Sequence, residues 1–124
     1  MDINSLIANE KGAKLHIIHP ATNEETGIMI TLVGADSVEW KTAMRSIRTR
    51  SLQNGKRKIS DEEAESMPFE MLAAVTLDWD GVEENGKPIK FSKEEALRIY
   101  KTVPVIAEQV DKFVGDRANF LPSA

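Results

Sequence analysis

The chain has 124 residues and a formal net charge of −4, and its hydrophobic and charged fractions of 41% and 29% are those of an ordinary globular protein. This length suits a single domain. No stretch approaches the roughly 18 consecutive apolar residues that a membrane helix needs, and the N-terminus lacks the basic start and apolar run of a signal peptide. The absence of Cys excludes a disulfide framework and a thiol-based site.

Charged residues are distributed unevenly along the chain. Seven basic and no acidic residues occur from Lys41 to Lys58, whereas nine acidic and no basic residues occur from Asp61 to Glu84. Such asymmetry indicates complementary faces, either within one fold or between neighbouring copies. The acidic block would repel phosphate, which weighs against nucleic acid as a partner.

The first third of the chain predicts an arm and a β-hairpin. Residues 1–12 predict a loosely held arm that ends at Gly12. Lys14–His19 and Ile28–Val33 are rich in β-branched residues and predict two strands joined by the loop at 20–27. An isolated hairpin is marginal in water, so we expect the next helix to cover its apolar face.

That helix is predicted to start at Asp36, which forms a capping-box-like pair with Glu39. Its apolar residues fall in one stripe of a helical wheel, consisting of Trp40, Ala43, Met44, Ile47 and Ser51. Trp40 lies in the middle of the stripe and is therefore predicted to pack in the core against the hairpin. Gly55 indicates the end of the helix, and 56–58 predicts an exposed link.

A second capping box, Ser60 with Glu63, opens the next helical region. Its apolar stripe consists of Ala64, Met67, Met71, Leu72 and Val75. Pro68 cannot donate the helical hydrogen bond and would clash one turn back. The pattern therefore predicts a short helix over 61–66 and a longer one over 68–77.

The last part of the chain predicts a turn followed by two helices. Trp79 precedes a turn-rich stretch, across which Val82 and 89–91 are predicted to pair. Ser92 with Glu95 is a third capping box, and Pro104 should interrupt the helix that it opens. The final helix is predicted to run from Pro104 towards Asn119, with one apolar face made of Val103, Ile106, Ala107, Val110, Phe113 and Val114. The fold is thus predicted as α+β: a single, mainly α domain in which an N-terminal β-hairpin precedes four or five helices.

Few residues suggest chemistry. His16 and His19 are three apart in a predicted strand and so point to opposite faces, which favours surface imidazoles over a metal site. The carboxylates of Asp78, Asp80 and 83–84 have no nucleophile or base beside them, which favours a solvated acidic turn. The seven glycines are scattered and build no phosphate-binding loop. We therefore predict no enzymatic activity, no cofactor and no metal.

The basic segment 41–58 is the feature that most suggests a binding function. Four of its residues, Lys41, Arg45, Arg48 and Arg50, are candidates for partner binding or self-association. A basic helix beside Trp40 could also contact nucleic acid, as in a small phage or prophage regulator. Because Trp40 belongs to the apolar stripe and faces inward, a solvated face that meets protein is favoured. We expect neither nucleic acid nor a membrane as partner.

Several motifs in order resemble the tail assembly chaperones of long-tailed bacteriophages (siphophages). The first group matches the opening hairpin of that family and the start of its helix, and comprises His19–Glu24, Gly27, Ile30–Gly34 and Asp36–Ser37. The second group matches its later turn-and-helix signature and its C-terminal helix, and comprises Trp79–Val82, Gly86–Ala96 and Asp116–Leu121. Together the motifs cover about residues 13–121, which would form one chaperone-like domain.

The resemblance implies a non-enzymatic protein that binds and solubilises the tape measure protein and promotes tail tube assembly. It also implies contacts with the major tail (tube) protein. The family further implies a longer, frameshifted version of the same protein, with which this chain, the short form, would associate. Homo-oligomers, location in the host cytoplasm and absence from the mature virion are further implications. A tape measure protein is a long apolar helix, which grooves between helices could shield.

Overall fold

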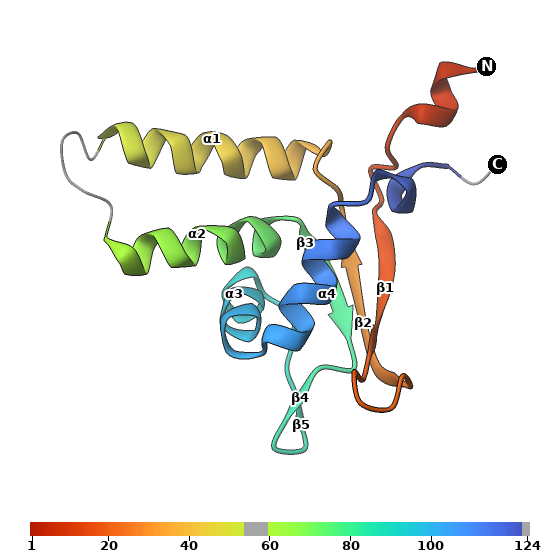
Figure 1. The fold of residues 1–124 in the computed structure, drawn as a ribbon, viewed down its shortest axis with the longest axis vertical. Helices are drawn as coiled ribbons and strands as arrows, with labels where there is room; N and C mark the ends of the chain where they lie inside the picture. Colours follow the sequence, from red (N-terminus) through yellow and green to blue (C-terminus); the bar gives the residue numbers. More distant parts are fainter. Residues whose placement is uncertain (54–59, 123–124) are drawn as a thin grey trace.

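A small antiparallel sheet and four α-helices make up the part of the chain that the structure, a computed structural model, describes: residues 1–53 and 60–122 (Figure 1). The elements in chain order are η1 (Ile3–Leu6), β1 (Ala13–Ile18), β2 (Glu25–Leu32), α1 (Val38–Gln53), α2 (Asp61–Ala74), β3 (Thr76–Asp80), β4 (Glu83–Glu84), β5 (Lys87–Pro88), α3 (Lys93–Thr102), α4 (Pro104–Val114) and η2 (Arg117–Phe120). The predicted α+β domain, with its N-terminal hairpin and its helices, is confirmed. The predicted helix end at Gly55 and the link at 56–58 lie outside the described residues.

The main sheet has the order β1-β2-β3, and both strand pairs are antiparallel. The hairpin of β1 and β2 was predicted, but β3 was not: the helix expected over 68–77 ends at Ala74. Thr76–Asp80 instead pairs with β2, where Trp79 lies opposite Ile30. Pairing along the open side of β2 satisfies the backbone groups of this segment, which outweighs its helical apolar pattern.

The predicted break at Pro68 is also wrong, because α2 runs through this residue as one helix. Ser60 caps its start by accepting a hydrogen bond from the backbone N–H of Glu63 at 3.1 Å, as predicted. Buried side chains, Met71 among them, hold its C-terminal half. Pro68 has no N–H to donate to the carbonyl of Ala64, one turn earlier. Both residues are exposed, so water can satisfy that carbonyl.

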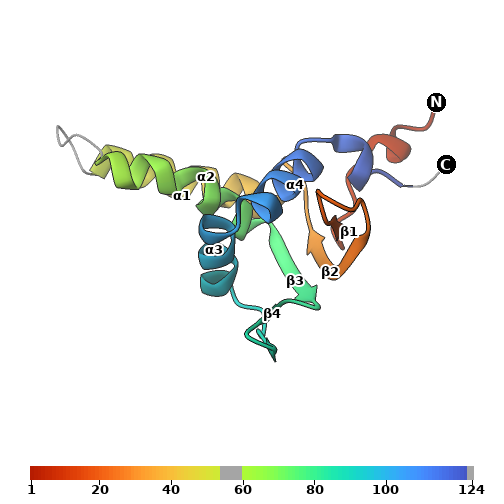
Figure 2. The ribbon, with the colours of Figure 1, turned by 60° about the horizontal axis from the view of Figure 1, so that its bottom comes forward.

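Helix α1 does not cover the hairpin as expected. It runs alongside α2, and the two helices project together from the body of the molecule (Figures 1 and 2). Its N-cap is Ser37, whose Oγ accepts a hydrogen bond from the backbone N–H of Trp40 at 3.1 Å, and not the predicted Asp36. The Asp36 carboxylate instead accepts a hydrogen bond from Arg117 at 2.8 Å. Trp40, in the first turn of α1, is half-buried and packs against the core.

Helix α4 lies against β1 instead, where Gln109 joins the two elements. Its side-chain amide donates to the carbonyl of Ile18 at 2.8 Å, and its Oε1 accepts from the N–H of Ile18 at 2.9 Å. The separation of α3 and α4 at Pro104 and the buried face of α4 were both predicted.

The final helix is shorter than predicted, since α4 ends at Val114 and η2 follows. Phe120 in η2 packs edge-on against Phe113, with 5.4 Å between ring centroids, and lies directly over Gly34. The carbonyl of Phe120 accepts a hydrogen bond from the N–H of Asn9 at 2.7 Å. This contact anchors the end of the N-terminal arm, while Met1–Ile7 is exposed.

The core lies where the sheet meets α2, α3 and α4. Its buried hydrophobic residues include Ile17, Ile30, Leu32, Val75, Trp79, Tyr100 and Val110. Thr76 is a buried polar residue beside them, and its hydroxyl lies 2.7 Å from the hydroxyl of Tyr100. Within the described residues every buried side-chain polar atom has a partner.

Candidate functional site

A groove of about 760 Å³ runs between α1, α2 and the start of α3. Its floor is apolar, with Ala43 and Ile47 from α1, Ala73 and Ala74 from α2, and Leu97 from α3. The three alanines leave the space open, because larger side chains at these positions would fill it. Ala43 and Ile47 were predicted to belong to a core stripe, and the groove was not predicted, because three separate helices form it.

An ion pair closes the distal end of the groove. Arg50 Nη2 on α1 lies 2.7 Å from Glu70 Oε2 on α2, and both side chains line the groove. The hydrogen bond to Glu70 and its negative charge raise the pKa of Arg50. This pair ties the last turn of α1 to α2.

Lys93 lies at the opposite end of the groove, near the C-terminus of α2. Its ammonium group donates hydrogen bonds to the carbonyls of Ala73 at 3.3 Å, Ala74 at 3.0 Å and Thr76. A cation at this place satisfies free carbonyls of the helix C-terminus and complements the helix dipole. Burial lowers the pKa of Lys93, and the nearby charge of Glu39 partly opposes this shift. Both ends of the apolar groove are therefore charged.

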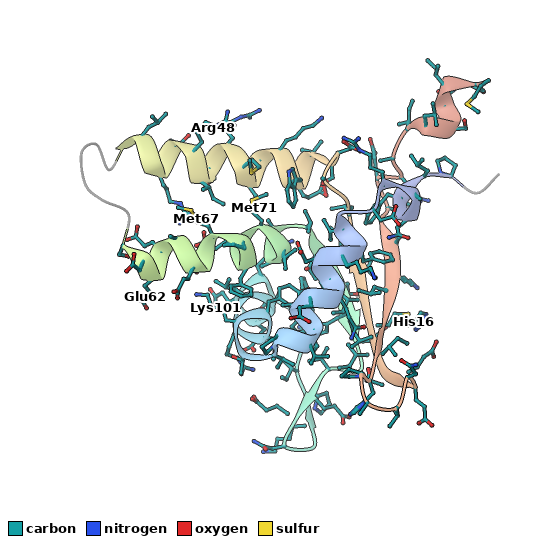
Figure 3. The ribbon with its side chains drawn as sticks, in the orientation of Figure 1. His16, Arg48, Glu62, Met67, Met71 and Lys101 are labelled. Atoms are coloured by element: carbon teal, nitrogen blue, oxygen red, sulfur yellow. The ribbon has the colours of Figure 1, made fainter. Side chains whose placement is uncertain are left out.

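The four basic residues predicted as a partner surface divide between two sides of α1. Lys41, Arg45 and Arg48 follow helical spacing and are exposed on the outer side, and we call these three the basic face. Arg50, nine residues after Lys41, is turned by about 180° and meets Glu70. Figure 3 shows Arg48 on the side of α1 turned away from α2, with Met67 between the two helices.

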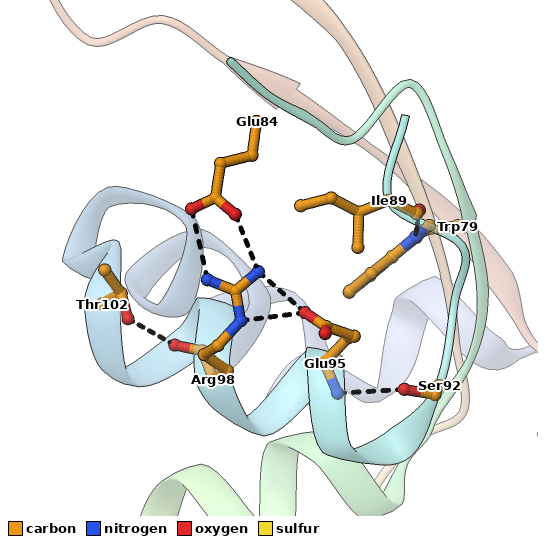
Figure 4. A network of polar contacts seen from close by, with 7 residues as sticks. All are labelled: Trp79, Glu84, Ile89, Ser92, Glu95, Arg98 and Thr102. Atoms are coloured by element: carbon orange, nitrogen blue, oxygen red, sulfur yellow. Dashed lines mark hydrogen bonds and ion pairs between the residues drawn. The ribbon is translucent and has the colours of Figure 1, made fainter. Parts of the chain in front are cut away.

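The predicted acidic turn lies at the end of β3. Asp78, Asp80 and Glu83 are exposed there and line a hollow of about 440 Å³. Glu84 instead pairs with Arg98 at 3.2 Å. Arg98 also contacts Glu95 on its own helix at 2.8 Å (Figure 4).

The same region contains the cap of α3 and the hydrogen bonds that order the β4–β5 hairpin. Ser92 accepts a hydrogen bond from the N–H of Glu95 at 3.1 Å, which confirms the third predicted cap. Trp79 Nε1 donates to the carbonyl of Ile89 at 2.8 Å (Figure 4). The N–H of Ile89 in turn donates to the carbonyl of Val82 at 2.8 Å, so the predicted pairing across this turn is confirmed.

The two histidines are exposed and belong to the hairpin. His19 Nδ1 accepts a hydrogen bond from the N–H of Ala21 at 3.2 Å, within the loop that follows β1. No group of three or more possible metal ligands occurs in residues 1–53 and 60–122. Over the same ranges, no helix is both long and apolar enough to cross a membrane.

Comparison with known proteins gives one match. The profile of the YdaY prophage protein family matches residues 35–123, which run from the start of α1 past η2 and include every residue that lines the groove. No curated protein and no solved structure matches the chain. Because the match spans well over half of the sequence, the chain belongs to the YdaY prophage protein family.

Proposed function

We propose that this prophage protein is a non-catalytic tail assembly chaperone that binds an apolar helical segment of the tape measure protein in the groove between α1, α2 and α3. The observation that carries the proposal is the apolar floor of this groove, lined by small side chains and bounded by charged residues. An amphipathic helix laid into such a groove buries one apolar face and leaves its polar face in water.

The dimensions of the groove fit a short helical segment. From Val38 to Arg50, the lining of α1 extends over twelve intervals of about 1.5 Å each, or roughly 18 Å. This length matches about three helical turns of a client, which present apolar residues at positions i, i+3, i+4 and i+7. A long apolar client could be covered by several chaperone copies, one segment each.

Two further observations support a role in tail assembly. The family match places the protein in a prophage context. The ordered motifs from the hairpin to Asp116–Leu121 resemble tail assembly chaperones. In this proposal the protein acts in the host cytoplasm, promotes assembly of the tail tube from the major tail protein, and is absent from the mature virion.

The test is co-expression with the tape measure protein of the same prophage, followed by measurement of the soluble tape measure fraction and of co-purification. We expect the chain to raise the soluble fraction and to co-purify with it. The double variant Thr42→Glu/Ser46→Glu places two carboxylates inside the groove at exposed positions and should abolish both effects, because a charge cannot be buried cheaply against an apolar helix.

A matched control carries the same added charge elsewhere on α1. Thr49→Glu/Leu52→Glu changes two exposed residues outside the lining of the groove and should retain both effects. An unchanged soluble fraction with the parent protein contradicts the chaperone function. Equal loss in both variants contradicts the groove as the site.

A further inference from the structure

We propose that copies of this protein associate head to tail, with the basic face of one copy (Lys41, Arg45 and Arg48) docked on the acidic hollow (Asp78, Asp80 and Glu83) of the next. This proposal is independent of the chaperone function, because it uses neither the groove nor a client. It rests on the charge, the exposure and the placement of the two surfaces.

The basic face is an unpartnered side of a projecting helix. Its three cationic side chains are exposed, and none of them forms an ion pair within residues 1–53 and 60–122. Leu52, near the C-terminal end of α1 and outside the lining of the groove, is 75% exposed. An interface here would therefore combine apolar contact with charge pairing, as protein interfaces commonly do.

The acidic hollow offers the complementary charge on a rigid frame. Asp78 and Asp80 alternate with Trp79 along β3, so their exposed carboxylates share one side of the strand while Trp79 is buried in the core. Glu83 follows on β4, and the lining also includes Lys90. Unlike Glu84, which pairs with Arg98, the three carboxylates of the hollow form no ion pair among the described residues.

The spacing of the charges matches along the two elements. Lys41 and Arg45 are separated by roughly 6 Å along the axis of α1, and Asp78 and Asp80 by roughly 7 Å along β3. Two cations of one copy can therefore face two carboxylates of another at the same time. Such paired contacts determine the orientation of the partners as well as their attraction.

The two surfaces lie on separate parts of the molecule. Helix α1 projects sideways from the upper part of the molecule in Figure 1, whereas the turn after β3 and the β4–β5 hairpin lie at its lower end. The basic face of a copy therefore cannot reach its own hollow. The contact joins two different surfaces, so it produces a ring if the rotation closes and an open helical assembly if it does not.

Sedimentation velocity at low and high salt is the first measurement. We expect oligomers at about 50 mM salt that dissociate at about 500 mM, because salt screens the attraction between solvent-exposed charges. A protein that is monomeric at both salt concentrations, or whose oligomers are indifferent to salt, overturns the proposal.

Charge reversal on each surface identifies the contact. The basic-face variant Lys41→Glu/Arg45→Glu/Arg48→Glu and the hollow variant Asp78→Lys/Asp80→Lys/Glu83→Lys should each be monomeric at low salt. An equimolar mixture of the two should regain oligomers, because every junction then joins opposite charges again. A mixture that stays monomeric, or single variants that associate like the parent protein, overturns the proposal.

A charge-matched control distinguishes the proposed contact from a general effect of net charge. Lys14→Glu/Lys101→Glu/Lys112→Glu reverses three exposed lysines elsewhere and should associate like the parent protein. Equal loss of association in this control would show a net-charge effect and would also overturn the proposal.

Asp78→Asn/Asp80→Asn removes charge without adding any, and thermal unfolding should show all variants folded. If this milder variant is folded and retains full association, the hollow is not the contact.

Discussion

Tyr100 has the largest of the fully buried side chains, and its hydroxyl group lies 2.7 Å from Thr76 Oγ. That Oγ also donates to the carbonyl of Leu72 at 2.7 Å. The two hydroxyl groups thus link α3 to the end of α2 and the start of β3. Burial raises the pKa of Tyr100 to about 12, against a smaller lowering by the hydrogen bond with Thr76.

This shift predicts a specific alkaline loss of stability. An unfolded tyrosine has a pKa of about 10, so the folded protein holds the phenolic proton more tightly than the unfolded chain does. The corresponding stability is complete below pH of about 10 and is lost as the pH rises through about 12, to a total of about 3 kcal/mol. Urea unfolding of the parent protein and of Tyr100→Phe between pH of about 9 and about 12, the range that spans this loss, should show a steeper decline for the parent. Parallel curves would contradict this prediction.

Local capping was the most predictable feature at the scale of single residues. Ser60 and Ser92 cap their helices as the sequence pattern predicts. At α1, two capping residues stand side by side, and the sequence favoured the wrong one. Arg117 engages Asp36 from 81 positions away, which leaves Ser37 as the cap. No local pattern contains that information.

At the scale of elements, the hairpin and the α3–α4 pair were predictable because each has its own period and its own turn residues. Strand β3 was not, because Val75 completes a helical stripe and only five residues follow before Gly81. The backbone of Gly81 has φ of +79°, and a side chain there would overlap the carbonyl of Gly27. The end of β3 thus depends on contact with a residue far away in the sequence.

The groove was unpredictable for a related reason. Ala43 and Ile47 show the period of an apolar helical face, which is equally typical of a core and of an open groove. Only the direction of α1, alongside α2 and away from the sheet, decides between the two. The four basic residues are exposed, as predicted. Their charge alone did not show that Arg50 would point towards α2, where it pairs with Glu70, and not to the side of the basic face.

Pro68 predicts an element-scale gain in stability. Replacing it with Ala restores a backbone donor for the carbonyl of Ala64 and removes the ring from the interior of α2. Proline in a helix interior is about 3 kcal/mol less favourable than alanine, and we expect Pro68→Ala to raise the free energy of unfolding by about 1–3 kcal/mol. Urea unfolding measures this, with Glu65→Ala on the same helix as the control. An unchanged or lowered free energy would show that α2 is already adapted to Pro68.

At the scale of the whole molecule, the charge layout predicts that nucleic acid is not a partner. The basic face carries three cations on one helix, while Asp78, Asp80 and Glu83 make the far end acidic. Trp40 is half-buried and packs against the core, so its ring is engaged with protein and is not presented for stacking on bases. A gel-shift assay at about 150 mM salt, where phosphate contacts are already weakened, should detect no binding to duplex DNA or RNA. Sub-micromolar binding that is lost in the basic-face variant would instead support the prophage regulator.

The contact between Gln109 and Ile18 has a consequence for how copies can crowd together. β1 is an outer strand of the sheet, and exposed strand edges act as templates for pairing with another chain. The carboxamide of Gln109 occupies both the N–H and the carbonyl of Ile18, the groups with which an added strand would pair. Helix α4 thus blocks this edge with a side chain that imitates a neighbouring strand. An added strand would have to displace this side chain before it could pair with the end of β1.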